Sequence, residues 1–130
     1  MRTALVETFQ FTLRDCFVGT LEDMLGVGVR DEVFRLLERS GVTVREIALR
    51  FDDVVEIVTR VFGSSARVLV YRTVANLYEE YSQRPNFTFY DSLKDRISLL
   101  REKVVADLLK PRHASNIDDS IYLSTRSKVQ

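Results

Sequence analysis

The chain has 130 residues, of which 45% are hydrophobic, and this is enough to bury the core of one domain. Its 19 Lys and Arg residues balance 19 Asp and Glu residues, so no net charge attracts nucleic acid or an anionic membrane. Charges interrupt the start of the chain before a signal-peptide apolar region can form, and no apolar run reaches the roughly 18 residues that a membrane span needs. We therefore expect a cytoplasmic protein.

Two segments repeat one pattern and predict two helix-Gly-helix units. Leu25-Gly26-Val27-Gly28-Val29-Arg30 and Phe62-Gly63-Ser64-Ser65-Ala66-Arg67 each follow an amphipathic stretch and lead into another one. A glycine just past an apolar helical run can adopt the positive φ that ends a helix. We expect Gly26 and Gly63 to take this role.

The first unit comprises predicted helices over residues 8–25 and 29–39, of which the second ends at Ser40-Gly41. Gly19, inside the first helix, costs about 1 kcal/mol relative to Ala and predicts close packing of another backbone or a local break. A capping-box pattern from Thr43 to Glu46 then predicts a short helix through about residue 49.

In the second unit, Asp52 or Asp53 is expected to cap a helix that runs to residue 62. Its predicted apolar stripe is Phe51, Val54, Val55, Val58, Val61 and Phe62.

The next predicted helix, over residues 66–82, has two apolar faces. One face consists of Ala66, Leu69, Val70, Val74, Leu77 and Tyr81, and the other of Val68, Tyr71, Ala75 and Tyr78. A helix apolar over so much of its circumference is central to a bundle or contributes to an interface, so the second face is our candidate dimer surface unless the terminal helix covers it. The β-branched run over residues 66–71 leaves a buried strand as an alternative.

The C-terminal part begins with a break at Arg84-Pro85-Asn86, and Asp91 or Ser92 is expected to cap a final helix that runs to about Lys110. The fold prediction is therefore an all-α bundle of five or six helices over residues 1–111. Residues 112–130 are Ser-rich and aperiodic, which predicts a flexible tail. Its apolar cluster, Ile121, Tyr122 and Leu123, is expected to contact a protein partner.

Candidate chemical groups are few, and we predict no catalytic, cofactor-binding or metal-binding site. Cys16, the single cysteine, shares an apolar helical face and is interpreted as an inert thiol. His113, the single histidine, has no second candidate ligand near it in the sequence. Asp52, Asp53 and Glu56 could share a divalent cation, but helix capping and a favourable interaction with the helix dipole explain them better.

A helix-turn-helix DNA-binding regulator using residues 36–62 is the alternative function. Thr43, Glu46, Ile47 and Ala48 have the spacing of a short second helix that precedes a recognition helix. The expected recognition helix, however, begins with three carboxylates where phosphates and base edges would lie, and these carboxylates repel DNA.

Residues 17–81 resemble the Nitrosopumilus output domain type, a group of small, mainly archaeal helical domains. The resemblance lies in four segments: Leu36-Leu37-Glu38-Arg39-Ser40-Gly41-Val42, Glu46-Ile47 with Phe51, Val61-Phe62-Gly63-Ser64-Ser65-Ala66-Arg67, and Leu77-Tyr78-Glu79-Glu80-Tyr81. It implies a non-enzymatic output or interaction module of the kind attached to signalling proteins. We accordingly predict a protein-interaction or signalling module that self-associates as a dimer, without a cofactor, a nucleic acid or a small-molecule substrate.

Overall fold

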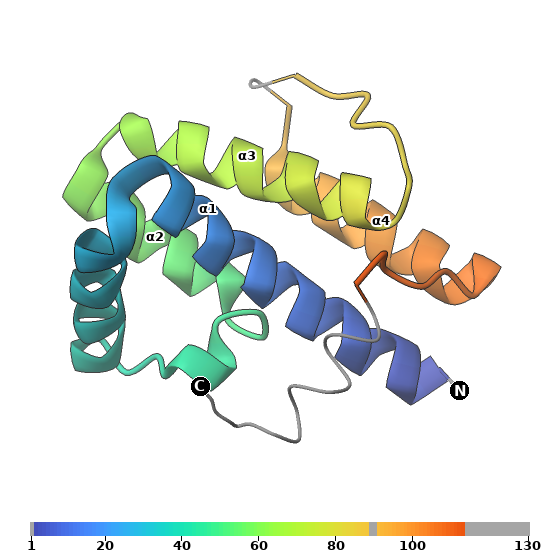
Figure 1. The fold of residues 1–130 in the computed structure, drawn as a ribbon, viewed down its shortest axis with the longest axis horizontal. Coiled ribbons are helices and arrows are strands. Elements are labelled where there is room, and N and C mark those ends of the chain that lie inside the picture. Colours follow the sequence, from blue (N-terminus) through green and yellow to red (C-terminus); the bar gives the residue numbers. More distant parts are fainter. Residues whose placement is uncertain (1, 89–90, 114–130) are drawn as a thin grey trace.

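The computed structural model describes residues 2–88 and 91–113, and within them the chain is all-helical and contains no strand. Figure 1 shows the arrangement of α1 (Arg2–Arg39), the 3₁₀ turn η1 (Val44–Glu46), α2 (Phe51–Phe62), α3 (Ser65–Glu80) and α4 (Leu93–Asp107). The all-α prediction is confirmed, and the strand alternative for residues 66–71 is wrong because these residues belong to α3. The expected count of five or six helices is not confirmed, since the described residues form four α-helices.

The two helices predicted on either side of Gly26 form the single kinked helix α1. Gly26 has φ 89° and ψ 166°, and α1 changes direction sharply there (Figure 1). Arg30 reaches back across the kink, where its Nη1 lies 2.5 Å from a Glu22 carboxylate oxygen. Gly63 also has a positive φ, 62°, and its N–H donates to the Thr59 carbonyl as α2 ends. Both glycines therefore have the positive φ that the repeated pattern predicted.

The core lies where the first segment of α1 crosses α3 and α4. α1 contributes buried side chains at intervals of four, namely Leu5, Phe9, Leu13, Phe17 and Leu21. The predicted inner face of α3 is confirmed, because all six of its members from Ala66 to Tyr81 are buried. A methyl group at Gly19 would meet nothing within 4 Å, so the expectation of close backbone packing there is wrong.

The start of α2 differs from its prediction. The helix begins at Phe51 after Arg50, so Asp52 and Asp53 lie in its first turn and neither is its cap. Val61, expected on the apolar stripe, is 54% exposed, whereas Ile57 is buried. The buried face of α2 is therefore rotated towards Ile57.

The connection before α2 keeps its predicted capping box but forms less helix than expected. The Thr43 N–H donates to Glu46 Oε1 over 3.0 Å, and this bond, with a second one from the Thr43 hydroxyl, lowers the pKa of Glu46. Only one 3₁₀ turn follows, and residues 47–50 form turns.

At the C-terminal end, Ser92 caps α4, since its Oγ accepts a bond from the Asp95 N–H. The helix ends before the predicted Lys110 because Leu108 has φ 55°. Pro111 is buried, and the Arg112 N–H donates to the Glu80 carbonyl over 2.7 Å. Arg112 and His113, which the prediction assigned to the tail, therefore pack against the end of α3, while Ile121, Tyr122 and Leu123 lie outside the described residues.

No helix in residues 2–88 or 91–113 combines the length and the apolar character required to cross a membrane.

Candidate functional site

The predicted dimer face of α3 is largely covered within the chain. The rings of Tyr71 and Tyr78 contact Phe87, with centroid distances of 5.7 and 5.0 Å, and the Tyr78 hydroxyl donates to the Arg96 carbonyl over 2.8 Å. Ala75 is half-buried, and Val68 is 40% exposed. Among the four predicted interface residues, Val68 is the one that most clearly remains available to a second subunit, and the dimer stays a prediction.

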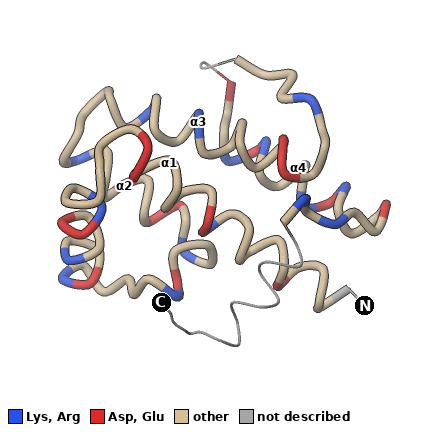
Figure 2. Tube along the Cα trace, in the orientation of Figure 1, with Lys and Arg blue, Asp and Glu red and all other residues tan. Residues whose placement is uncertain are grey.

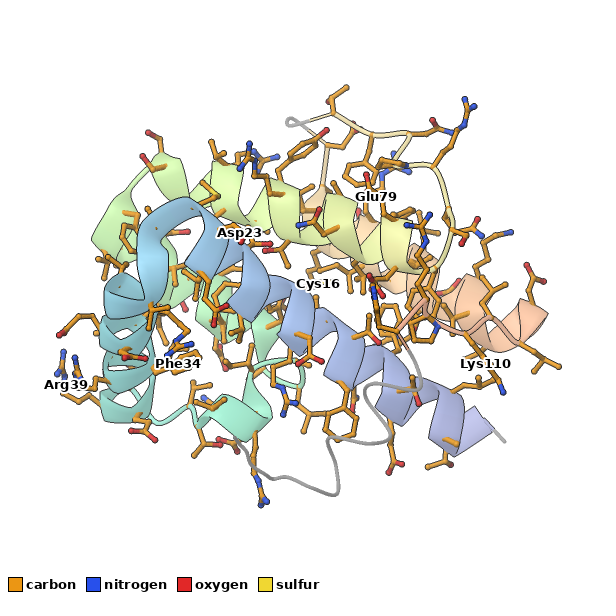
Figure 3. The ribbon with its side chains drawn as sticks, viewed as in Figure 1. Cys16, Asp23, Phe34, Arg39, Glu79 and Lys110 are labelled. Atoms are coloured by element: carbon orange, nitrogen blue, oxygen red, sulfur yellow. The ribbon has the colours of Figure 1, made fainter. Side chains whose placement is uncertain are left out.

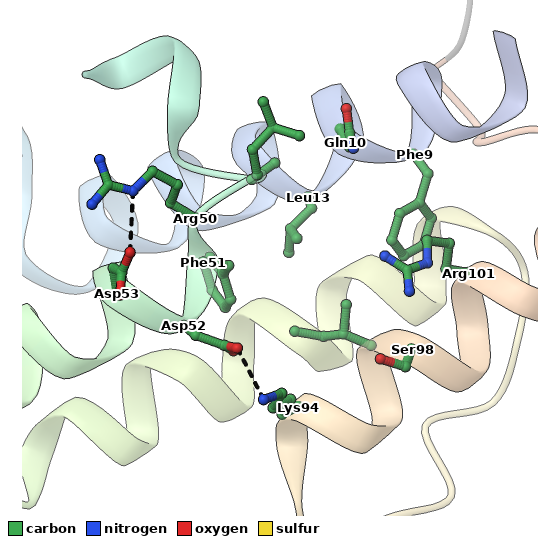
Figure 4. Close-up of a pocket in the computed structure, with 13 residues that line it drawn as sticks. Phe9, Gln10, Leu13, Arg50, Phe51, Asp52, Asp53, Lys94, Ser98 and Arg101 are labelled. Carbon is green, nitrogen blue, oxygen red and sulfur yellow. Dashed lines mark hydrogen bonds and ion pairs between the residues drawn. The ribbon is translucent and has the colours of Figure 1, made fainter. Parts of the chain in front are cut away.

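A groove runs between α2 and α4. It consists of two hollows of about 520 and 500 Å³ that share Phe51, Asp52, Lys94 and Ile97. We call this feature the α2–α4 groove, and Figure 4 shows its first hollow. The first hollow is completed by Phe9, Gln10, Leu13, Ala48, Leu49, Arg50, Asp53, Ser98 and Arg101, and the second by Val55, Thr59, Gly63, Ser64, Arg67, Val70, Ser92 and Leu93.

The groove exists because α2 and α4 each pack against α1 and α3, with little packing between α2 and α4 themselves. Asp52 and Lys94 form an ion pair of 3.0 Å across the groove (Figure 4), although their side chains are 65% and 71% exposed. An exposed pair of this kind contributes only about 0–1 kcal/mol, so the groove can open at little cost.

The groove has an apolar floor and a charged rim. Phe9, Leu13 and Phe51 are buried beneath the first hollow. On the rim, Arg50 Nε lies 3.1 Å from Asp53 and its Nη1 donates to the Gly41 carbonyl. Arg101 has no hydrogen-bond or ion-pair partner within residues 2–88 and 91–113. Among the described residues, the rim therefore presents paired charges of both signs and the unpaired cation of Arg101.

A smaller hollow of about 420 Å³ adjoins the groove between α1 and η1. We call it the α1–η1 hollow; its lining is Glu7, Gln10, Phe11, Arg14, Arg45, Ala48 and Leu49. It shares Gln10, Ala48 and Leu49 with the groove. Leu49 is 66% exposed, the highest fraction among the large hydrophobic side chains of the described ranges.

A polar hollow between α1 and α3 contains Cys16 and His113 but does not form a nucleophilic site. Figure 3 labels Cys16 and Asp23 between these helices, and Glu79 of α3 also lines the hollow. Burial, and then the Glu80 and Asp15 carboxylates, raise the pKa of Cys16 to about 12, whereas a cysteine nucleophile requires a lowered pKa. His113 Nδ1 lies 2.8 Å from both carboxylate oxygens of Glu80, a partner 33 residues away that sequence analysis did not identify.

The three carboxylates of α2 are each paired with a cation. Asp52 contacts Lys94, Asp53 contacts Arg50, and Glu56 lies 3.8 Å from Arg60. In the part of the chain that the structure describes, no three His, Cys, Asp or Glu side chains gather in a way that could hold a metal ion.

The arrangement of residues 36–62 does not favour insertion into DNA. The short second helix of the predicted motif is only one 3₁₀ turn, and Lys94 of α4 pairs with Asp52 in the first turn of α2, the end that would contact bases. Figure 2 shows acidic and basic residues interspersed along the helices rather than gathered into a basic face.

Sequence analysis did not single out the groove, because its lining comes from segments far apart in the chain. Leu49 was the available signal, since it is a leucine in a connection between helices. Comparisons with protein-family models, curated proteins and solved structures gave no match. The surfaces described above are therefore the basis on which a function can be inferred.

Proposed function

We propose that this chain is a non-enzymatic protein-interaction module, of the output-module kind that the resemblance of residues 17–81 implies, and that it binds an amphipathic helix of a partner protein in the α2–α4 groove. The observation that carries this proposal is the apolar floor between α2 and α4, which within residues 2–88 and 91–113 is spanned by the exposed Asp52–Lys94 ion pair. Amphipathic helices bind such grooves by inserting apolar side chains spaced three, four and seven residues apart.

The charges of the rim favour a partner helix with both acidic and basic residues beside its apolar face. Arg101 is available to a carboxylate of the partner, and opening the Asp52–Lys94 pair frees one charge of each sign. Apolar contact with Val55, Ile97 and Leu49 supplies the hydrophobic part of the binding energy.

Self-association is the second part of the proposal, and Val68 is the residue at which it is best tested. Tyr71 and Tyr78 pack against Phe87, so changing either one perturbs the fold together with any interface. Val68 is exposed, and a substitution there leaves these ring contacts in place.

The groove is tested by selecting helical peptides from a display library against the full chain. We expect amphipathic sequences that bind the wild type and lose affinity for Thr59→Arg, which places a long cation in the second hollow. Thr3→Arg is the matched control, because Thr3 is also an exposed helical threonine but lies outside the groove. Peptides that bind Thr59→Arg as well as the wild type would contradict the proposed site.

A further inference from the structure

We propose that the α1–η1 hollow is the docking site of the chain's own C-terminal segment, with Asp118 and Asp119 near Arg14 and Arg45 and the cluster Ile121-Tyr122-Leu123 against Leu49. The hollow shares Gln10, Ala48 and Leu49 with the α2–α4 groove, so the docked segment competes with a partner for one end of that groove. This competition rests on the proposed function, whereas the docking itself does not.

The hollow offers apolar surface next to two cations, Arg14 and Arg45, and one carboxylate, Glu7; Arg14 Nη2 also lies 3.5 Å from Asp15. Leu49 is 66% exposed, and Phe11 is half-buried with the Arg14 guanidinium 5.0 Å from its ring centroid. Arg45 has no hydrogen-bond or ion-pair partner in the described part of the chain. A segment that combines apolar side chains with carboxylates therefore matches this hollow.

The C-terminal segment has this composition. Asp118 and Asp119 are the only acidic residues after His113, and they lie between Ile117 and the apolar cluster that begins at Ile121. The polar hollow is closer to His113 but is a poor site for this segment, because Asp15, Asp23, Glu79 and Glu80 line it and repel the two aspartates.

The reach of the chain permits the docking. The Arg112 N–H and the His113 ring hold the chain at Glu80, and both residues line the polar hollow together with Asp15 of α1. The next residue of α1 along the helix towards its N-terminus, Arg14, lines the α1–η1 hollow. A helix is about 10–12 Å across, so half its circumference is about 17 Å. Seven residues, 114–120, span up to about 23–25 Å when extended, which is enough to bring residue 121 to the hollow.

Crosslinking within the full chain tests this docking. The variant Leu49→Cys with Tyr122→Cys is treated with a short bis-maleimide, and Leu99→Cys with Tyr122→Cys is the matched control, because Leu99 is also an exposed leucine (51%) but lies on α4 outside the hollow. We expect the intramolecular product to form about ten times faster at position 49, since docking raises the local concentration of the two thiols. Variants that carry only one of the introduced cysteines show whether the reagent also links that cysteine to the native Cys16.

The charges provide a second test on the same pair of thiols. Arg45→Glu should lower the crosslinking rate at position 49 to the rate at position 99. Asp118→Lys combined with Asp119→Lys should have the same effect. All three changes together should restore part of this faster crosslinking, because Glu at position 45 then attracts a lysine while Arg14 keeps its positive charge. Equal crosslinking rates at positions 49 and 99, in the variants without the charge changes, would overturn the proposal. Crosslinking only between two chains would also overturn it and would assign the site to a second copy of the chain. These reactions contain no partner peptide. A negative crosslinking result therefore contradicts the docking of the C-terminal segment alone, whereas the peptide-binding experiment tests the proposed function separately.

Discussion

Replacing Gly26 by Ala should destabilise the protein through backbone strain alone. A methyl group at this position would meet nothing within 4 Å, so no steric clash contributes. The backbone, at φ 89° and ψ 166°, lies in a region that is essentially restricted to glycine, and a residue with a Cβ held there costs about 1–3 kcal/mol.

Gly19→Ala is the matched control and should have the opposite effect. It adds the same methyl group to the same helix, again with nothing within 4 Å, but Gly19 does not have a positive φ. Alanine inside a helix is more stable than glycine by about 0.5–1 kcal/mol, because less backbone entropy is lost on folding. The two variants should therefore differ in free energy of unfolding by about 1.5–4 kcal/mol, or about 6–16 °C in Tm for a domain of this size.

Urea and thermal unfolding followed by circular dichroism measure this difference. A D-alanine at position 26, introduced by chemical synthesis, should be tolerated because D-residues favour positive φ. A Gly26→Ala variant as stable as the wild type, or as stable as Gly19→Ala, would refute the assignment of the kink to a conformation that requires glycine.

Four further outcomes follow from the structure. Glu46→Gln should destabilise the protein at neutral pH, and the gap to wild type should close as the pH falls through the lowered pKa of Glu46, because a depressed carboxyl pKa stabilises the fold only while the group is ionised; unfolding at a series of pH values checks this. Cys16, with a pKa of about 12, should resist iodoacetamide at pH 8 in the folded protein and react after denaturation, as mass spectrometry would show; fast reaction of the folded protein would contradict its burial. Light scattering at micromolar concentration should give about twice 15.0 kDa for the wild type and the monomer mass for Val68→Glu, whereas a monomeric wild type would contradict self-association. Titration of labelled duplex DNA at low salt should show weak or no binding, and tight binding that is lost on changing Arg45 and Arg50 to Ala would favour a DNA-binding regulator.

Local sequence chemistry predicted several element boundaries, whereas the starts of α1 and α2 and the ends of η1 and α4 differ from the prediction. The kink at Gly26, the end of α2 at Gly63 and the Ser92 cap each depend on a few adjacent residues, so their signals are readable without knowledge of the fold. The buried face of α3 was likewise predictable, because the helical period alone places its six apolar residues on one side.

Which surfaces are covered and which are exposed depends on contacts between segments that are far apart in the sequence. Tyr71 and Tyr78 looked like an uncovered apolar face, but Phe87 packs against them, and nothing in the residues of α3 specifies that contact. The pairing of His113 with Glu80 has the same origin. The sequence alone therefore determined the helix breaks at Gly26 and Gly63 and the buried face of α3, since these depend on backbone conformation and helical period. Only the tertiary structure decided the α2–α4 groove, because the groove lies between two helices that both pack against α1 and α3 and pack little against each other.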